Sequence, residues 1–330
     1  MKKTILAAAM LAAATPALAQ QQVQIKLGTL APSGSSWHEL LKEMSEKWLA
    51  ASGGTVKLRI YPGGTQGSEG EMIRKMAVGQ LQGAAITSVG LHDIVPEPQA
   101  VTVPLMFDTA DEVKRGLAKL EPTFNSLLEK KGYVGLSWGV IGAVKLFCTK
   151  PFHTPAEAAG AKMFTWEGDP GSVKAWKAAG FTPVVLSSTD VVTSLQTGMI
   201  DCVANVPLYM LTARLFEKAP YMIDVPWGWL AGATVVRKDA WEKIPPDVRP
   251  KLLAVAQELG ARVDAEVAKL NADAVSAMKK QGLTVLTVQA APWRAAAEKS
   301  WSVVRGEVVP AAFFDQVKAL RDSLRAQKSP

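Results

Sequence analysis

The sequence predicts an α/β protein of two lobes, each a mixed or parallel sheet flanked by helices, with a long helix spanning both lobes. Segments with strand periodicity alternate with segments of helical periodicity, which is typical of sheets covered by helices. The chain has 330 residues, more than one hydrophobic core usually organises. Residues 247–281 form one helical pattern that, at about 1.5 Å per residue, exceeds ~50 Å and is longer than a lobe.

The N-terminus has the features of an export signal. Lys2 and Lys3 precede an apolar run from Ile5 to Ala14, and Ala17-Leu18-Ala19 has the small-x-small pattern of a cleavage site. The run is shorter than the roughly 20 residues of a membrane span, and no cysteine lies at the cleavage site for lipid attachment. We therefore expect a signal peptide over residues 1–19, cleaved after Ala19, and a protein free in the periplasm.

The first lobe is predicted to be a doubly wound sheet. Val23–Leu30 and Val56–Ile60 alternate as strands do, and apolar residues recur at helical spacing between Trp37 and Trp48. A helix around residues 72–81 leads to a further strand over Gly83–Val89. Short loops at the binding edge of this sheet follow from the βαβ order.

The second lobe is predicted from the segment Val184–Pro207. Val184–Leu186 is a short β-branched strand, and the helix after it ends at Gly198, which suits a C′ position. A second strand begins at Met199. Parallel strands joined by one helix end at the same edge of a sheet, where ligands of open α/β sheets bind. This reasoning places the Asn205 side chain at a ligand site.

The two lobes are expected to be interleaved along the chain. Residues 20–143 with about 226–255 are assigned to lobe I, and residues 144–225 with about 270–330 to lobe II. A strand over Trp138–Phe147 crosses between them. A coiled-coil dimer seam is the alternative for the long helix, but its face is rich in alanine and its period drifts, so a monomer is favoured.

The composition argues against several classes of function. Lysine and arginine are interspersed with acidic residues at helical spacings, which indicates solvated faces and makes nucleic acid an improbable partner, although the net charge is +7. The histidines, His38, His92 and His153, have no metal-ligand spacing, and no G-x-S-x-G nucleophile motif occurs. The glycine-rich loop Gly63–Ser68 lacks the lysine of a phosphate loop. No metal, cofactor or catalytic residue is therefore predicted.

A family resemblance is carried by Leu195-Gln196-Thr197-Gly198, Asp201 and Asn205. This run resembles the A-L-Q-T-G and D-G-x-E-N pattern of the solute-binding proteins of tripartite ATP-independent periplasmic (TRAP) transporters, with Cys202 and Ala204 in place of the glycine and glutamate. The similarity continues in other segments: Lys26–Gly28, Ser35–His38, Tyr61–Gly67, Pro104–Phe107, Gly160–Phe164 and the helix Pro246–Gly282.

The resemblance implies a two-lobed periplasmic binding protein of type II-like form, without catalytic activity. Such a receptor binds a small organic molecule between its lobes by hinge closure and delivers it to a TRAP-type membrane permease. Two alternatives remain at this stage. One is a secreted two-lobed enzyme, and the other is a receptor that presents its ligand to a membrane sensor.

Two positions depart from the family pattern. The lobe II strand of the family carries an arginine that clamps a substrate carboxylate, and here Phe164 occupies its place. A second family arginine corresponds to Val144. The adjacent Lys145 is a candidate point charge, although it alternates with Val144 on the strand and is equally well explained as a solvated lysine.

The remaining candidates suggest a pocket with aromatic walls and a few fixed polar groups. Trp166 is expected on a strand-to-helix turn, and Trp37 and Trp227 in loops or strand ends, although packing is the alternative for each tryptophan. Together with Phe164 and Lys145, the predicted ligand-binding residues are Trp37, Thr87, Ser88, Trp166, Asn205, Tyr209 and Trp227. We expect a ligand that is less anionic and more apolar or aromatic than a small dicarboxylate.

The two cysteines, Cys148 and Cys202, leave two possibilities open. In an oxidising compartment they can form a disulfide, and unpaired they would be small buried apolar residues. The sequence does not give the distance between their Cα atoms.

Overall fold

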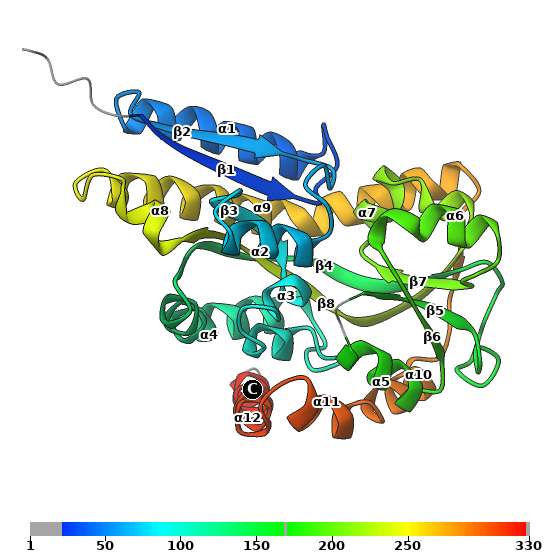
Figure 1. The fold of residues 1–330 in the computed structure, drawn as a ribbon. Coiled ribbons are helices and arrows are strands. Elements are labelled where there is room, and N and C mark those ends of the chain that lie inside the picture. The colour runs from blue at the N-terminus through cyan, green and yellow to red at the C-terminus, as the bar shows by residue number, and fades with distance from the viewer. Residues whose placement is uncertain (1–21, 168–169, 328–330) are drawn as a thin grey trace, which may run out of the picture.

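The computed structural model describes residues 22–167 and 170–327, so the predicted signal peptide lies outside the described part of the chain. The strands form one sheet in the order β2-β1-β3-β8-β4-β7-β5-β6, and β9 pairs with β8. Figure 1 shows the two ends of this sheet as two groups of strands with helices packed around them. The fold is α/β with two lobes, as predicted. No helix of the described residues is both long enough and apolar enough to cross a membrane.

The first lobe contains a parallel three-stranded unit in which β1 pairs with both β2 and β3. Its helices begin at strong caps: the Ser35 hydroxyl accepts a hydrogen bond from the His38 amide, and Ser68 and Glu71 form a capping box. The elements are β1 Val23–Thr29, α1 Ser36–Ala51, β2 Val56–Tyr61, α2 Glu69–Ala77, β3 Gly83–Thr87, α3 Ser88–Leu91, η1 Glu97–Val101 and α4 Ala110–Lys130.

The second lobe repeats this plan. β5 pairs in parallel with β6 on one side and β7 on the other. The elements are β5 Lys162–Trp166, α5 Pro170–Ala178, β6 Thr182–Leu186, η2 Ser188–Asp190, α6 Val191–Gln196, β7 Cys202–Asn205, α7 Pro207–Thr212 and η3 Leu215–Glu217. The predicted strand–helix–strand unit is present, but its second strand starts at Cys202 rather than Met199, and Asn205 is its last residue.

Two long antiparallel strands, β4 Tyr133–Cys148 and β8 Tyr221–Arg237, join the lobes. Their pairing shifts register at three places, one of them between Val140 and Gly142. Gly142 has a φ of 147°, and a Cβ atom there would lie 2.7 Å from Nδ2 of Asn271. Irregular pairing re-aims strands locally, so the crossing region is where the sheet can bend between lobes.

The long helix α9, Arg249–Lys280, packs along both lobes. Near its start the Trp48 indole donates a hydrogen bond to the Leu252 carbonyl (3.0 Å), and near its end Met278 lies in the core of the second lobe with Phe216. Between them, the buried Asn271 donates to the Ile141 carbonyl on β4 (3.2 Å) and accepts from the Leu208 amide (3.0 Å). The predicted spanning helix is therefore confirmed.

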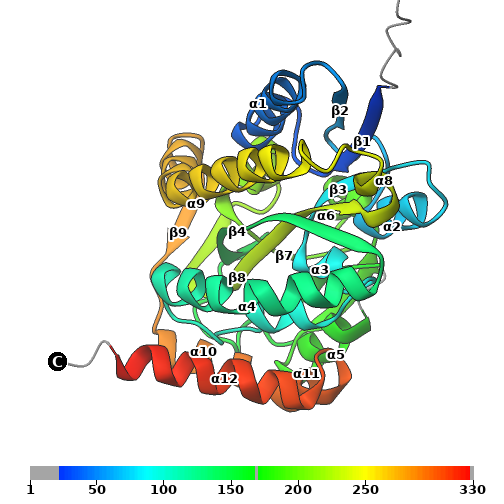
Figure 2. The same cartoon turned by 90° about the vertical axis from the view of Figure 1, so that its left-hand side faces the viewer.

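The last helix, α12, packs on α4 of the first lobe. Figure 2 shows α9, α4 and α12 crossing the molecule one below another. Phe313 and Val317 of α12 pack with Phe124 of α4 in one core, although residues 270–330 are assigned to lobe II in the predicted division. The exact division of the chain into lobes stays a prediction. The remaining elements are α8 Lys238–Glu242, β9 Thr284–Leu286, α10 Ala290–Glu298, α11 Trp301–Glu307 and α12 Ala311–Ala326.

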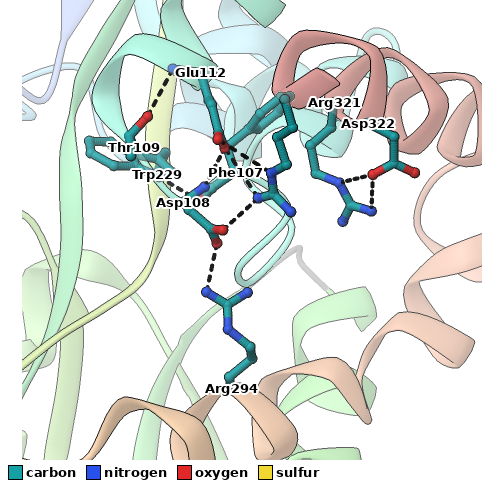
Figure 3. Close-up of polar contacts among 9 residues, drawn as sticks. Phe107, Asp108, Thr109, Glu112, Trp229, Arg294, Arg321 and Asp322 are labelled. Carbon is teal, nitrogen blue, oxygen red and sulfur yellow. Dashed lines mark hydrogen bonds and ion pairs between the residues drawn. The ribbon is translucent and has the colours of Figure 1, made fainter. Parts of the chain in front are cut away.

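A group of ion pairs, which we term the Asp108 cluster, holds these C-terminal helices. Asp108 pairs with Arg294 of α10 (2.7 Å) and with Arg325 of α12 (2.8 Å), and Arg325 also pairs with Glu112 of α4 (3.1 Å). Glu112 accepts a hydrogen bond from the Asp108 amide (2.9 Å). Figure 3 shows Arg294 reaching Asp108 from α10, while Glu112 lies on the other side of Asp108.

The structure decides between the two possibilities that the sequence left open for the cysteines. Cys148 of β4 and Cys202 of β7 stand directly opposite each other, with Cα atoms 4.1 Å apart, and form a disulfide.

The expectation that Trp37 and Trp227 lie in loops or strand ends is wrong: Trp37 is the second residue of α1, and Trp227 is in the middle of β8. The strand β8 was not predicted because Pro226 and two glycines, Gly228 and Gly232, interrupt its apolar pattern.

Candidate functional site

A cavity lies between the lobes, where β4 and β8 cross, and encloses about 1020 Å³, part of it open to solvent. We term it the aromatic chamber. Residues of both lobes line it: from the first lobe and the crossing strands Val89, Gln99, Thr102, Val103, Pro104, Val144, Trp227, Gly228, Trp229 and Leu230; from the second lobe Phe164, Thr165, Trp166, Gly171, Ser172, Ala175, Trp176, Ala204 and Asn205; and from the C-terminal part Ser300, Val304 and Val308.

Aromatic rings form much of the chamber wall. Trp227 stacks on Trp176 with ring centroids 5.0 Å apart and an angle of 14° between planes. Phe164 and Trp166 meet edge to face, at 6.1 Å and 80°. The Trp229 indole donates its hydrogen to the Phe107 carbonyl (2.9 Å), so it offers the chamber only apolar surface. These rings provide the flat apolar faces on which a planar molecule can stack.

A second cavity of about 770 Å³ adjoins the chamber, and Trp166, Asn205 and Leu230 line both. Trp37, Thr87 and Tyr209, three of the predicted ligand-binding residues, line this second cavity. Asn205 is 7% exposed, and its Oδ1 accepts a hydrogen bond from the Val206 amide (2.8 Å). No described residue forms a hydrogen bond with its Nδ2. The Asn205 amide thus stands at the junction of the two cavities.

The second cavity also contains the buried carboxyl group of Glu69. It accepts hydrogen bonds from the Thr87 amide (2.8 Å), the Thr87 hydroxyl (2.7 Å) and the Gly90 amide (3.0 Å). Burial raises its pKa, an effect that these three donors oppose. Burial also raises the pKa of Tyr209, with a smaller contribution from the negative charge of Glu69.

The structure brings most of the predicted site residues together, but not all of them. Phe164, Trp166, Asn205 and Trp227 line the chamber. Lys145 lines neither cavity, because its ammonium group pairs with Asp224 at 2.8 Å while the neighbouring Val144 faces the chamber.

Ser88 is the other predicted residue that lines neither cavity. It is fully buried at the start of α3, and its hydroxyl has no partner among the described residues. Thr87, its neighbour in the sequence, is therefore the residue of this pair that faces the second cavity.

Many lining residues were not found from the sequence, among them Gln99, Glu69 and Trp176. Gln99 lies on a short 3₁₀ helix after Pro98, a segment without useful periodicity. Glu69 reads as a solvated residue in the first turn of α2, and Trp176 as a core position of α5. Within residues 22–167 and 170–327 there is no group of three histidine, cysteine or acidic side chains that could hold a metal ion.

The family model of the bacterial extracellular solute-binding proteins, family 7, matches residues 27–306. The chain belongs to this family. The match covers both lobes and every residue that lines the chamber except Val308.

Similar proteins include other members of this class. The C4-dicarboxylate-binding periplasmic protein DctP of Rhodobacter capsulatus is 26% identical over 317 residues, which cover 94% of this chain and 93% of that protein. The 2,3-diketo-L-gulonate-binding periplasmic protein YiaO of Escherichia coli is 25% identical over 282 residues, 85% of each chain.

Solved structures share the fold of this family 7 protein. A TRAP periplasmic solute-binding protein from Desulfovibrio salexigens, with bound orotic acid, superimposes with a TM-score of 0.84 at 18% identity, covering 93% of this chain and 99% of that one. A Pseudomonas putida F1 protein with bound D-glucuronate gives 0.83 at 22% identity, with 93% and 98% covered. At these identities the structures support the two-lobed fold alone.

Proposed function

We propose that this protein is the extracytoplasmic receptor of a TRAP-type transporter. It binds one small organic molecule between its lobes and delivers that molecule to a membrane permease for uptake. The receptor works in the periplasm, after removal of residues 1–19. Membership of family 7 supports the receptor class, and relatives named for dicarboxylate and diketogulonate binding support a small organic ligand.

The position of the aromatic chamber is the main structural support for this proposal. It lies where β4 and β8 cross, and both lobes contribute side chains to its wall, such as Gln99 from one and Asn205 from the other. A ligand held there contacts both lobes at once, so it stabilises the closed arrangement over the open one. The register shifts in β4 and β8 provide the place where closure bends the chain.

The receptor function is tested by binding without turnover. Protein purified from the periplasm is denatured, and the small molecules released are identified by mass spectrometry. The same molecule is then titrated into ligand-free protein by calorimetry, and the radius of gyration is followed by X-ray scattering. We expect one molecule per chain, recovered unchanged, and a smaller radius of gyration when it is bound. Conversion of the molecule into a product would instead identify a secreted enzyme.

Asn205→Ala tests the site within this function. We expect a loss of about 1–3 kcal/mol of binding free energy, because the ligand's polar group loses its partner in a desolvated cavity. Thr212→Ala is the matched control, because Thr212 lines the outer part of the second cavity and its hydroxyl already bonds to the Leu208 carbonyl (3.0 Å). An unchanged calorimetric affinity in the Asn205 variant would exclude Asn205 from the site.

A further inference from the structure

The charge of the cavities is informative about the ligand. Among the described residues that line the aromatic chamber there is no aspartate, glutamate, lysine, arginine or histidine. In the adjoining cavity the charged residue among the described lining residues is Glu69, an acid. Lys145, the nearest cation considered from the sequence, is engaged by Asp224 outside both cavities. A ligand in the chamber therefore meets dipoles and rings, but no compensating positive charge.

This environment disfavours an anionic ligand. A carboxylate that leaves water needs a cation or several hydrogen-bond donors to compensate for its lost hydration. Among the described lining residues, the chamber wall contains neither an arginine fork nor a lysine. A cationic ligand lacks a partner as well, because Glu69 lies in the adjoining cavity and already accepts three hydrogen bonds.

Gln99 provides the polar feature that points to a ligand. Its side chain is 5% exposed and lines the chamber, and Oε1 has no hydrogen-bond partner among the described residues. The backbone of Gln99 is held in η1, since its amide donates to the Pro96 carbonyl (3.1 Å) and its carbonyl accepts from the Thr102 hydroxyl (3.0 Å). A buried acceptor without a donor is unfavourable, and an N–H or O–H group of a ligand would satisfy it.

The aromatic wall of the chamber indicates what kind of ligand bears this N–H or O–H donor. The stacked pair Trp176 and Trp227, the edge-to-face pair Phe164 and Trp166, and the carbon face of Trp229 surround the same space. A planar ring gains more from such faces than a small, strongly hydrated molecule does, because stacking and apolar burial both scale with the area of the ring.

We propose that the ligand is a neutral aromatic or heteroaromatic molecule that carries an N–H or O–H donor. Its ring lies between the tryptophan and phenylalanine faces of the chamber, its donor bonds to Oε1 of Gln99, and the Asn205 amide binds a second polar group across the cavity. This inference rests on the proposed receptor function and names the class of molecule that the receptor takes.

Three probes that share an indole ring but differ in net charge test the inference. Indole-3-acetamide is neutral, indole-3-acetate is an anion and tryptamine is a cation at pH 7. Calorimetry with the ligand-free protein is expected to give indole-3-acetamide a dissociation constant at least tenfold below those of the other two. Equal or tighter binding of the anion or the cation would overturn the inference, and so would the absence of binding by all three at millimolar concentration.

Two variants test the role of individual wall residues. Gln99→Leu keeps the size of the side chain but removes the acceptor, so we expect at least tenfold weaker binding of indole-3-acetamide, while 1-methylindole-3-acetamide, which lacks the ring N–H, changes less. Val144→Lys adds a cation to the wall and is expected to reverse the preference in favour of indole-3-acetate. If both variants bind the probes as the unchanged protein does, the chamber is not the site.

The molecule released from the purified protein separates this inference from the receptor function. A neutral ring compound supports both. A released sugar acid or dicarboxylate that binds at one molecule per chain and closes the lobes would overturn the proposed ligand class, while the receptor function would stand.

Discussion

The aromatic chamber and the Asp108 cluster use charge in opposite ways. The cluster brings Arg294 and Arg325 onto Asp108 and Glu112, and so ties α10 and α12 to the first lobe. The chamber, a cavity open to water in part, has rings and amides in its wall and no charged side chain among the described lining residues. In this protein arginine side chains hold helices together, while the described residues that line the chamber include no cation.

The net charge of +7 therefore says little about the ligand. Excess lysine and arginine on a surface act at long range and are screened by salt. What a bound molecule meets is the set of groups within hydrogen-bond distance of it. The side chains that line the chamber include two neutral amides, Gln99 and Asn205.

The largest expected effect comes from the wall of the chamber itself. Trp227→Ala should lower the free energy of unfolding by about 3–5 kcal/mol, because it leaves a cavity beside Trp176 and Phe181. Urea denaturation of the ligand-free protein measures this value. Trp166→Ala is the control, since Trp166 is only half-buried and should cost less. Equal losses in the two variants would contradict the deeper burial of Trp227 as the cause of its larger effect.

The Asp108 cluster should contribute less than the aromatic wall. Its charged groups are about one-third exposed, apart from Glu112, and exposed pairs contribute roughly 0.2–1 kcal/mol each. We expect Asp108→Asn to lower the free energy of unfolding by about 1–2 kcal/mol at low salt and by less in 1 M NaCl, where screening is strong. A loss that does not change with salt would show that Asp108 acts through its hydrogen bonds or packing instead.

The smallest expected effect concerns pH and the acid in the second cavity. Burial raises the pKa of Glu69 above its ordinary value of about 4.5. Such a group stabilises the fold below the unfolded pKa, and this contribution is lost as pH rises through the higher folded pKa. Glu69→Gln stays neutral at every pH. The stability of the unchanged protein relative to this variant should therefore fall as pH rises from about 4 to 8, which denaturation at a series of pH values measures.

A stability difference that instead rises over this range would show that the hydrogen bonds to Glu69 outweigh its burial. Glu71→Gln serves as the control, because Glu71 is a solvated acid whose pKa is lowered by its capping-box hydrogen bond to the Ser68 amide (2.8 Å). The stability that Glu71 contributes should be lost as pH falls, which is opposite to the pH dependence expected for Glu69.

The sequence predicted those parts of the fold in which the pattern is local. The strands β1 and β2, the Val184–Pro207 unit and α9 follow from alternation or helical spacing within one segment. The strand β8 is held by its partners on either side rather than by its own pattern, because Pro226 and its glycines weaken it. The packing of α12 on α4 joins segments nearly 200 residues apart and leaves no local signal.

The candidate site was also predicted only where the sequence has a local pattern. Phe164, Trp166 and Asn205 line one cavity. Asn205 was selected because it follows a predicted strand, Trp166 because it lies at a predicted strand-to-helix turn, and Phe164 because it occupies the position of the family arginine. Gln99 was missed because an orphaned acceptor is a property of the folded environment. Whether any of these residues contacts a ligand stays a prediction.

The disulfide between Cys148 and Cys202 makes the motion of the second lobe measurable without any ligand. Both cysteines are buried, at 1% and 0% exposure, and they join β4 to β7 three residues from Asn205. A thiol reagent can attack the bond only when these strands part. The rate of reduction under native conditions therefore measures how often this strand pair opens. A ligand that bridges Asn205 to the first lobe should lower that rate.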